Sequence, residues 1–313
     1  MILQSSTRKI RSTLFVATAL AAAAPALGGC APRRVGAPAR TSATARARRS
    51  VTAGSCGDPA GKEWGYEDGD HTLGPACWEA LQGDALCGAG EEQSPIDLTH
   101  ATPRDLPDLL FAYRPSKLRM RNNGHTVQVE YEQGSTLCTA PAGASCPDDR
   151  RFTLAQFHFH APSEHKVNGK SFPLEIHFVH VDEASRAKVV VGVLVEEGAA
   201  NAALDPVFSQ LPTKEGTVEP PGARIDGAAI LPAAQVYESY SGSLTTPSCT
   251  EGLAWYVMES PIQMSAEQIS KFTSIHTDHV SFAHTNRPVQ PLGKRVLLID
   301  STHDVTPPQG ANP

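Results

Sequence analysis

Two segments of this chain carry histidines at a spacing that suits metal binding. Residues 156–160, Gln-Phe-His-Phe-His, have the composition of a β-strand, and residues two apart in a strand point to the same face of a sheet. His158 and His160 therefore project together. A third imidazole, His177, lies in a second β-rich run at residues 174–180, which can pair beside the first. Three neutral imidazoles leave the fourth position of a zinc ion open, as in catalytic rather than structural zinc sites.

The pattern also has a simpler interpretation, because histidines that alternate with phenylalanines occur in ordinary half-buried strands. Gln156 and Glu175 favour the metal site. Each lies two residues before a histidine, on the same face of its strand, where it can accept the second N–H of His158 or His177. A His-Glu-x-x-His motif is absent from the sequence, which argues against a zinc protease.

The first thirty residues have the pattern of an export signal. A basic stretch at residues 8–11 precedes an apolar run at residues 14–20, which is too short for a membrane span. Residues 27–30, Leu-Gly-Gly-Cys, resemble the bacterial lipobox, in which the cysteine is lipidated. We therefore expect residues 1–29 to be removed and Cys30 to anchor an exported, periplasmic or cell-surface lipoprotein. An ordinary signal peptide cleaved nearby is the alternative.

Charge is distributed unevenly along the chain. Residues 1–50 contain nine of the 27 Lys and Arg residues and no Asp or Glu. Residues 51–313 therefore carry 18 basic and 33 acidic residues, a net charge of −15, which argues against a nucleic-acid partner. Residues 30–55 have no hydrophobic period, and we expect them to be a disordered basic tether beside a membrane surface.

The rest of the chain predicts one β-rich domain over residues 56–300, followed by a flexible tail at residues 301–313. Strands are expected at residues 125–131, 152–160, 174–181, 188–195, 253–259 and 295–299, and short helices at 76–81, 202–210 and 265–273. Residues 212–223 are expected to be irregular surface. The predicted fold class is mainly β (a β-rich α+β domain), with a large twisted, mostly antiparallel central sheet and short peripheral helices.

Seven cysteines suit an oxidising compartment. If Cys30 carries a lipid, six remain, which three disulfides would use, although the pairing is open on sequence alone. Cys138 and Cys146 flank a segment rich in turn-forming residues. We expect a local disulfide between these two across a hairpin loop.

Further motifs occur in the order of a known family. They are Trp64-Gly65-Tyr66, Gln93-Ser94-Pro95-Ile96-Asp97, Asn122-Asn123-Gly124-His125, the two histidine strands, Ser163-Glu164-His165, Tyr240-Ser241-Gly242-Ser243-Leu244-Thr245-Thr246-Pro247 and Arg287-Pro288-Val289-Gln290-Pro291-Leu292. On these motifs, residues 62–299 resemble the α-class carbonic anhydrases of secreted bacterial type. The resemblance implies a single domain with a sheet of roughly ten strands. It also implies reversible hydration of CO₂ to bicarbonate and a proton by a zinc-bound hydroxide, and is compatible with weak esterase activity.

The resemblance also implies roles for individual residues. The zinc (Zn²⁺) ligands would be His158, His160 and His177, supported by Gln156, Glu175, Tyr66 and Tyr240. The other catalytic residues would be Thr245, Glu164 and His125. Thr245 would orient the hydroxide, Glu164 would accept a hydrogen bond from Thr245, and His125 would be the proton shuttle. The CO₂ pocket would comprise Val179, Val190, Leu244, Thr246, Leu253 and Trp255. His165 and His180 would be buried structural residues.

Secreted members of this family commonly carry a disulfide at the positions of Cys87 and Cys249, which leaves Cys56 to pair with Cys77. The loop at residues 132–150 is longer than in compact members and can change the rim of the active-site cleft. A non-catalytic binding module is the alternative function, although retention of all three ligands with Thr245 and Glu164 argues against it. The sequence does not indicate an oligomeric state.

Overall fold

The structure is a computed structural model that describes Cys56, residues 58–147 and residues 150–301. The predicted signal peptide, the lipidation site Cys30, the basic tether before Cys56 and the tail after Ser301 lie outside the described residues. The described residues belong to one compact unit. Among the helices in these ranges, none has the length and apolar composition of a membrane span.

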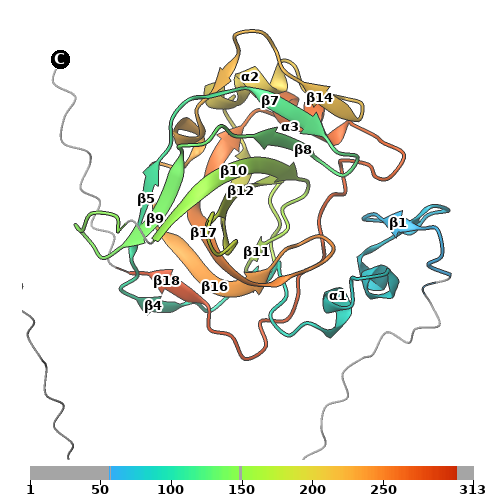
Figure 1. The fold of residues 1–313 in the computed structure, drawn as a ribbon, viewed down its shortest axis with the longest axis horizontal. Coiled ribbons are helices and arrows are strands. Elements are labelled where there is room, and N and C mark those ends of the chain that lie inside the picture. Colours follow the sequence, from blue (N-terminus) through green and yellow to red (C-terminus); the bar gives the residue numbers. More distant parts are fainter. Residues whose placement is uncertain (1–55, 57, 148–149, 302–313) are drawn as a thin grey trace, which may run out of the picture. The chain divides into compact units, whose positions relative to one another are not determined.

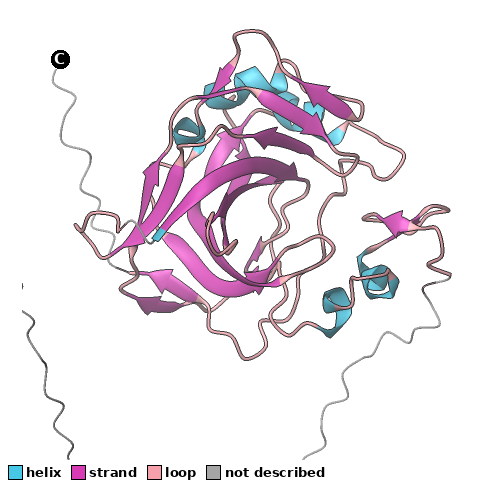
Figure 2. Ribbon diagram, viewed as in Figure 1, coloured by secondary structure: helices cyan, strands magenta, loops and turns pink. Residues whose placement is uncertain are grey.

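A mixed sheet of twelve strands forms the centre of the domain (Figures 1 and 2). Its main path runs β14 (Gly216–Val218), β7 (Arg119–Asn122), β8 (Val127–Glu130), β10 (Arg151–His160), β12 (Leu174–Val181), β13 (Lys188–Glu197), β17 (Glu251–Met264), β16 (Tyr237–Ser243), β18 (Leu298–Asp300) and β4 (Thr102–Arg104). Along this path β13–β17 and β18–β4 are parallel, and the other pairs are antiparallel. The prediction of a β-rich domain around a large, mostly antiparallel sheet is confirmed.

The remaining elements are short. β5 (Asp108–Ala112) pairs with β9 (Thr136–Ala140), which also pairs with β10. The two-stranded ladders are β1 (Glu63–Trp64) with β2 (Thr72–Leu73), β11 (Lys166–Val167) with β3 (Asp97–Leu98), and β15 (Arg224–Ile225) with β6 (Ser116–Lys117). The helices are η1 (Pro75–Ala80), α1 (Leu86–Ala89), η3 (Ala202–Leu204), α2 (Asp205–Phe208), η4 (Gly227–Ile230) and α3 (Ala266–Thr273), which begins with a capping box between Ser265 and Gln268.

The predicted strands all occur, with shifted ends. One segment that was predicted to be irregular contains a strand instead. Within residues 212–223, the short run Gly216–Val218 forms the edge strand β14 and pairs with β7. Two prolines follow it, and such a short, Pro-bounded strand gives no clear alternation in sequence. The prediction of an irregular segment is therefore wrong at β14.

The register of β10 against β12 sorts its side chains onto two faces. Phe157 pairs with Phe178, and the next pair is His158 with His177. Because successive residues alternate between faces, the phenylalanines and the histidines lie on opposite sides of the sheet. Phe157 and Phe178, with ring centroids 5.2 Å apart, belong to the main hydrophobic core. Burying each such side chain stabilises the fold by roughly 1.5–3 kcal/mol and holds the histidine face in register.

Candidate active site

Strand register places five predicted site residues in one row on the histidine face. The row crosses from β10 to β16 through Gln156, Val179, Val190, Trp255 and Tyr240, each the direct partner of the next. Cross-strand partners present their side chains to the same face. The sheet therefore brings together residues that are far apart in the chain.

The three predicted ligands converge beside this row. Ring centroids of His158, His160 and His177 lie between 4.6 and 5.4 Å apart. Each ring has one nitrogen at hydrogen-bond distance from an oxygen: His158 Nδ1 lies 2.8 Å from Gln156 Oε1, and His177 Nε2 lies 2.9 Å from Glu175 Oε1. One nitrogen from each ring lies within 4.8 Å of the other two, so the cluster could hold a metal ion.

The partner of the third histidine was not predicted. His160 Nδ1 lies 2.5 Å from the backbone carbonyl oxygen of Thr285. Thr285 is further tied to the same strand end, because its hydroxyl and its backbone N–H bond the main chain of Ala161. A backbone carbonyl carries no residue-type signal, so only the fold identifies this acceptor.

Burial keeps the histidine cluster neutral. It lowers the pKa of His158 well below the usual value, lowers that of His160 to about 4, and also lowers that of His177. The Nε2 atom of His160 is buried without a hydrogen-bond partner. Neutral imidazoles with a free lone pair are the form that binds transition metals.

Glu175 is the hub of the supporting network. Its carboxylate lies 2.7 Å from His165 Nδ1, accepts the backbone N–H of His165 at 2.8 Å and meets His177. Burial alone would raise the pKa of Glu175, but His165 and His177 lower it well below its usual value. A Cβ on Gly192, the strand partner of His177, would lie 3.0 Å from Glu175 Oε1. Glycine at this position therefore makes room for the carboxylate, which sequence reasoning missed.

The two histidines predicted to be structural are buried in hydrogen-bonded positions. His165 Nε2 lies 2.6 Å from the hydroxyl of Tyr240, which in turn donates to Ser94 Oγ. His180 Nε2 lies 2.6 Å from the hydroxyl of Tyr113. His165 also forms a metal-compatible group with Glu175 and His177, but direct hydrogen bonds already join their atoms.

Glu164 lies against the metal ligands. Its Oε1 accepts the backbone N–H of Arg287 at 2.8 Å, and its Oε2 lies 3.5 Å from His160 Nε2 and 3.8 Å from His177 Nδ1. Burial raises the pKa of Glu164, and a hydrogen bond from the side chain of Thr245 partly opposes the rise. The resulting pKa is about 7. The structure thus brings Thr245, Glu164 and the histidines into one site.

Tyr66 lies near enough to Glu164 to be affected by its charge. Its ring makes edge contacts with Trp64 and Trp78, at centroid distances of 5.7 and 5.9 Å. Burial, and then the negative charge of Glu164, raise the pKa of Tyr66 well above its usual value. Tyr66 therefore stays neutral beside the carboxyl group.

The predicted CO₂ pocket residues form part of a second apolar cluster. Val179, Val190, Leu253 and Trp255 all belong to it, and Leu244 packs against it. Thr246, the polar member of the predicted set, is half-buried. This cluster lies on the histidine face, opposite the main core.

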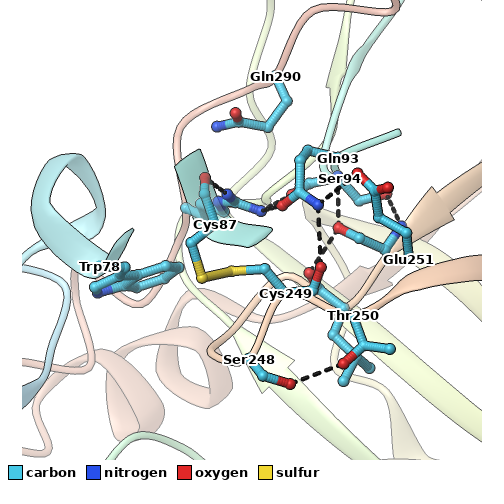
Figure 3. Close-up of a disulfide and its surroundings, with 12 residues drawn as sticks. Trp78, Cys87, Gln93, Ser94, Ser248, Cys249, Thr250, Glu251 and Gln290 are labelled. Atoms are coloured by element: carbon cyan, nitrogen blue, oxygen red, sulfur yellow. Dashed lines mark hydrogen bonds between the residues drawn. A yellow bond between two sulfur atoms is a disulfide. The ribbon is translucent and has the colours of Figure 1, made fainter. Parts of the chain in front are cut away.

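A disulfide ties the segment that carries Thr245 to the N-terminal part of the domain. Figure 3 shows Cys87 and Cys249 bonded next to Gln93, whose amide donates to the carbonyl oxygen of Cys249 at 3.0 Å. The guanidinium of Arg287, a motif residue without a predicted role, donates to the carbonyl oxygen of Cys87 and to Gln93 Oε1. The same arginine therefore links the disulfide to Glu164 through its backbone N–H.

The other two disulfides also have the expected partners: Cys138 is bonded to Cys146 and Cys56 to Cys77. The segment 132–150, expected to be a loop, contains strand β9, which pairs with the start of β10 at Arg151–Thr153. Arg151 lies nine residues from His160 along β10, roughly 30 Å at about 3.3 Å per residue. The effect of this segment on the rim of the site stays a prediction.

His125 lies in the turn before β8 and not within a strand. Its backbone N–H donates to Asn123 Oδ1, and its ring stacks on Trp64 at a centroid distance of 3.6 Å. Burial, and then the nearby His279, lower the pKa of His125 to about 4. The ordinary imidazole pKa of about 6.5 therefore does not apply to His125 in this conformation.

Comparison with known proteins agrees with the geometry. Residues 73–301 match the family model described as eukaryotic-type carbonic anhydrase. The chain is 41% identical to a carbonic anhydrase of Pectobacterium carotovorum over 237 residues, which cover 75% of this chain and 90% of that protein. It is 38% identical to a carbonic anhydrase of Neisseria gonorrhoeae over 236 residues, which cover 75% of this chain and 87% of that protein.

Among solved structures, the chain is similar to the α-carbonic anhydrase of Thermovibrio ammonificans in complex with the inhibitor sulfanilamide. The TM-score is 0.68 at 38% identity, with 76% of this chain and 99% of that chain covered. This chain therefore belongs to the eukaryotic-type, or α, carbonic anhydrase family. It is an enzyme of the carbonate dehydratase type, a lyase.

Proposed function

We propose that this enzyme is zinc-dependent and hydrates CO₂ reversibly to bicarbonate and a proton. The observation that supports the proposal most directly is the cluster of buried imidazoles from His158, His160 and His177, with ring nitrogens within 4.8 Å of one another. Relatives named carbonic anhydrase support the reaction itself.

The donor set suits zinc. Three neutral imidazole nitrogens are the protein ligands of a zinc ion with an open fourth position. A bound cation would also satisfy His160 Nε2, which otherwise lacks a hydrogen-bond partner in a buried environment. When bound, zinc lowers the pKa of a water ligand to about 7 and so supplies hydroxide at neutral pH.

Thr245 and Glu164 would orient the attacking oxygen. The carboxyl group of Glu164 is held in place by the backbone N–H of Arg287 and accepts a hydrogen bond from the hydroxyl of Thr245. The oxygen of Thr245 is then left to accept a hydrogen bond from the nucleophile, which turns a lone pair of the nucleophile toward CO₂. Orientation of this kind accelerates a reaction without proton abstraction by the protein.

The second apolar cluster supports binding of CO₂. Val179, Val190, Leu253 and Trp255 offer an apolar surface next to the histidines, and the ring of Trp255 lies 4.8 Å from that of His177. An apolar surface suits a substrate without charge or dipole moment, and it favours departure of the charged bicarbonate product.

His125 would carry the product proton to solvent. In its stacked conformation the ring is neutral and a weak base, because burial lowers its pKa to about 4. Rotation of the ring away from Trp64 into water would remove the burial and return the pKa toward about 6.5. The ring would therefore accept the proton in the rotated position and release it on return to the stacked one.

A stopped-flow CO₂ hydration assay on the purified chain tests the proposal. We expect catalysis that is lost on treatment with a zinc chelator, restored by added zinc and inhibited by sulfanilamide, the inhibitor named for the Thermovibrio enzyme. Weak hydrolysis of 4-nitrophenyl acetate should follow the same metal dependence. A folded, zinc-loaded protein without CO₂ hydration would instead be a binding module.

We also propose that the enzyme is exported and anchored by a lipid on Cys30. The sequence of residues 8–30 supports this, and the basic residues that follow suit an anionic membrane surface. Cys30→Ser should move the enzyme from the membrane fraction to the soluble fraction of the producing cells. An unchanged membrane-bound fraction would contradict the anchor.

A further inference from the structure

A second histidine lies against the proposed shuttle. The ring centroid of His279 is 5.3 Å from that of His125, and the two rings are tilted by 32°. The Nδ1 atom of His125 is buried and has no hydrogen-bond partner, while its ring stacks on Trp64. A proton that reaches His125 in this position therefore has a second imidazole beside it.

Two carboxylates flank the second histidine. His279 Nδ1 lies 3.5 Å from Glu63 Oε2, and His279 Nε2 lies 3.6 Å from Glu215 Oε1. The side chain of His279 is 26% exposed, and those of Glu63 and Glu215 are 68% and 49% exposed. Each ring nitrogen of His279 therefore has a carboxylate beside it, and the partial exposure of the ring gives a proton there a route to water.

A hydrogen bond joins the loop of His279 to the turn of His125. The hydroxyl of Thr277 donates to the carbonyl oxygen of Gly124 at 2.6 Å and accepts the N–H of Val280 at 3.2 Å. Gly124 has φ +90°, and a Cβ there would lie 2.9 Å from His279 Cδ2. The glycine therefore serves two purposes, since it allows the turn and leaves room for the second imidazole.

We propose that His279 is the second group of the proton path, which accepts the product proton from His125 and releases it to solvent or buffer. His125 Nδ1 has no hydrogen-bond partner, so the proton would leave a ring nitrogen of His125 and reach a ring nitrogen of His279 through a water molecule between the rings. Loss of that proton to water returns both imidazoles to the neutral form. This inference rests on the proposed role of His125 as the shuttle.

Charge gives the path a direction. The groups that face His279 are Glu63, Glu215 and His125, and Asp278 is its charged neighbour in the chain. A carboxylate lies beside each ring nitrogen of His279, whereas a proton on His279 repels one on His125. A proton passed to His279 would therefore have two carboxylates beside it and an exposed route to water.

Substitutions in the full-length, zinc-loaded enzyme test the path. In weakly buffered solution, His279→Gln should lower kcat for CO₂ hydration about tenfold, leave kcat/KM unchanged and recover on addition of imidazole. His276→Gln is the matched control, because His276 lies on the same loop but is exposed and its Nδ1 lies 3.0 Å from the carbonyl oxygen of Ser274. This control should keep the wild-type kcat.

The outcomes separate the two proposals. If His125→Ala lowers kcat and His279→Gln does not, the path through His279 is wrong and the shuttle stands. If neither variant changes kcat, the shuttle itself is wrong. Equal losses of kcat and kcat/KM in His279→Gln would indicate a structural role and overturn the inference. The double variant should lose no more than His125→Ala alone, because both residues serve one path.

An NMR titration gives a readout that does not depend on activity. In the metal-free and zinc-loaded proteins, the ring-proton signal of His125 should titrate at higher pH in His279→Gln than in the wild type, because a positive neighbour is removed. His276→Gln should leave the titration of His125 unchanged. An unchanged midpoint for His125 in His279→Gln would show that the two rings are not coupled and would overturn the inference.

Discussion

His158 and His177 stand directly opposite each other across β10 and β12, with ring centroids 5.4 Å apart and ring planes at 89°. The strands are antiparallel, so the acceptor that lies two residues before each histidine is on a different side of the pair. Gln156 holds His158 from one side and Glu175 holds His177 from the other. This arrangement fixes two imidazoles at right angles and leaves one nitrogen of each free for a common ligand.

Replacement of His160 by alanine should abolish zinc binding and CO₂ hydration. The variant loses one of three ligands, and two imidazoles do not complete a zinc site of this class. The metal-free protein should remain folded, because its large core does not depend on one ion. Zinc content by atomic emission, hydration rate and near-UV circular dichroism check these points, with His276→Ala as control. Near-wild-type zinc content in His160→Ala would show that the ligand assignment is wrong.

Thr245→Val should lower kcat/KM about 100-fold, because the nucleophile loses the acceptor that orients it. Thr245→Ser keeps the hydroxyl group and should retain most of the activity. Zinc content should stay unchanged in both variants, since Thr245 is not proposed as a ligand. Equal activity in the valine and serine variants would mean that the hydroxyl has no role in orientation.

Gly192→Ala should weaken zinc binding about 10- to 100-fold. The added Cβ would lie 3.0 Å from Glu175 Oε1 and should displace the carboxylate that holds His177. Competition with a chromophoric chelator measures the zinc affinity. Thermal unfolding of the metal-free variant serves as the control, because a general loss of stability would show there as well. Unchanged affinity would mean that the position of Glu175 tolerates the methyl group.

Two of the disulfides close loops of very different length, which predicts different contributions to the free energy of unfolding. Cys87 and Cys249 are separated by 162 residues, and Cys138 and Cys146 by 8. Loop-closure entropy alone gives about 5 kcal/mol for the first bond and about 2.5 kcal/mol for the second. Paired alanine variants, compared by urea unfolding, should follow this order. Loss of the first bond should also lower kcat/KM, because it holds the segment that follows Thr245. Equal destabilisation would contradict the argument.

Stability should fall as the pH falls below about 6.5. Burial lowers the pKa of His180 to about 3, so between pH 6.5 and pH 3 the unfolded chain binds a proton at this residue and the folded chain does not. The free energy of unfolding therefore decreases as pH decreases in that window. Between pH 7 and pH 5, the free energy of unfolding of His180→Gln should fall by about 2 kcal/mol less than that of the wild type. Urea unfolding of both metal-free proteins at the two pH values measures this, and identical losses would contradict it.

Local spacing was sufficient to predict the centre of the site. A separation of two residues in a strand fixes the face of a side chain, so His158 and His160 had to point together. The same rule placed Gln156 and Glu175 beside the histidines that they contact. The order of the motifs then indicated the family, which the comparisons confirm.

The missing parts of the site depend on contacts between distant segments. Thr285 acts on His160 through a backbone carbonyl that lies 125 residues away in the chain. Gly192 lacks the Cβ that would crowd the carboxylate of Glu175. His279 lies beside His125 because its loop is hydrogen-bonded to the turn at Gly124. A sequence pattern records which side chains exist at one spacing. It does not record which carbonyl, empty volume or distant ring lies next to them.

The sequence by itself therefore determined the strands that carry the ligands, the acceptors two residues before His158 and His177, and the enzyme family. Strand periodicity and motif order are local properties of a sequence. Only the tertiary structure decided the acceptor of His160, the space for Glu175, the burial of His125 and the position of His279 beside it. These depend on strand register and on the packing of separate loops, which arise when the whole sheet assembles.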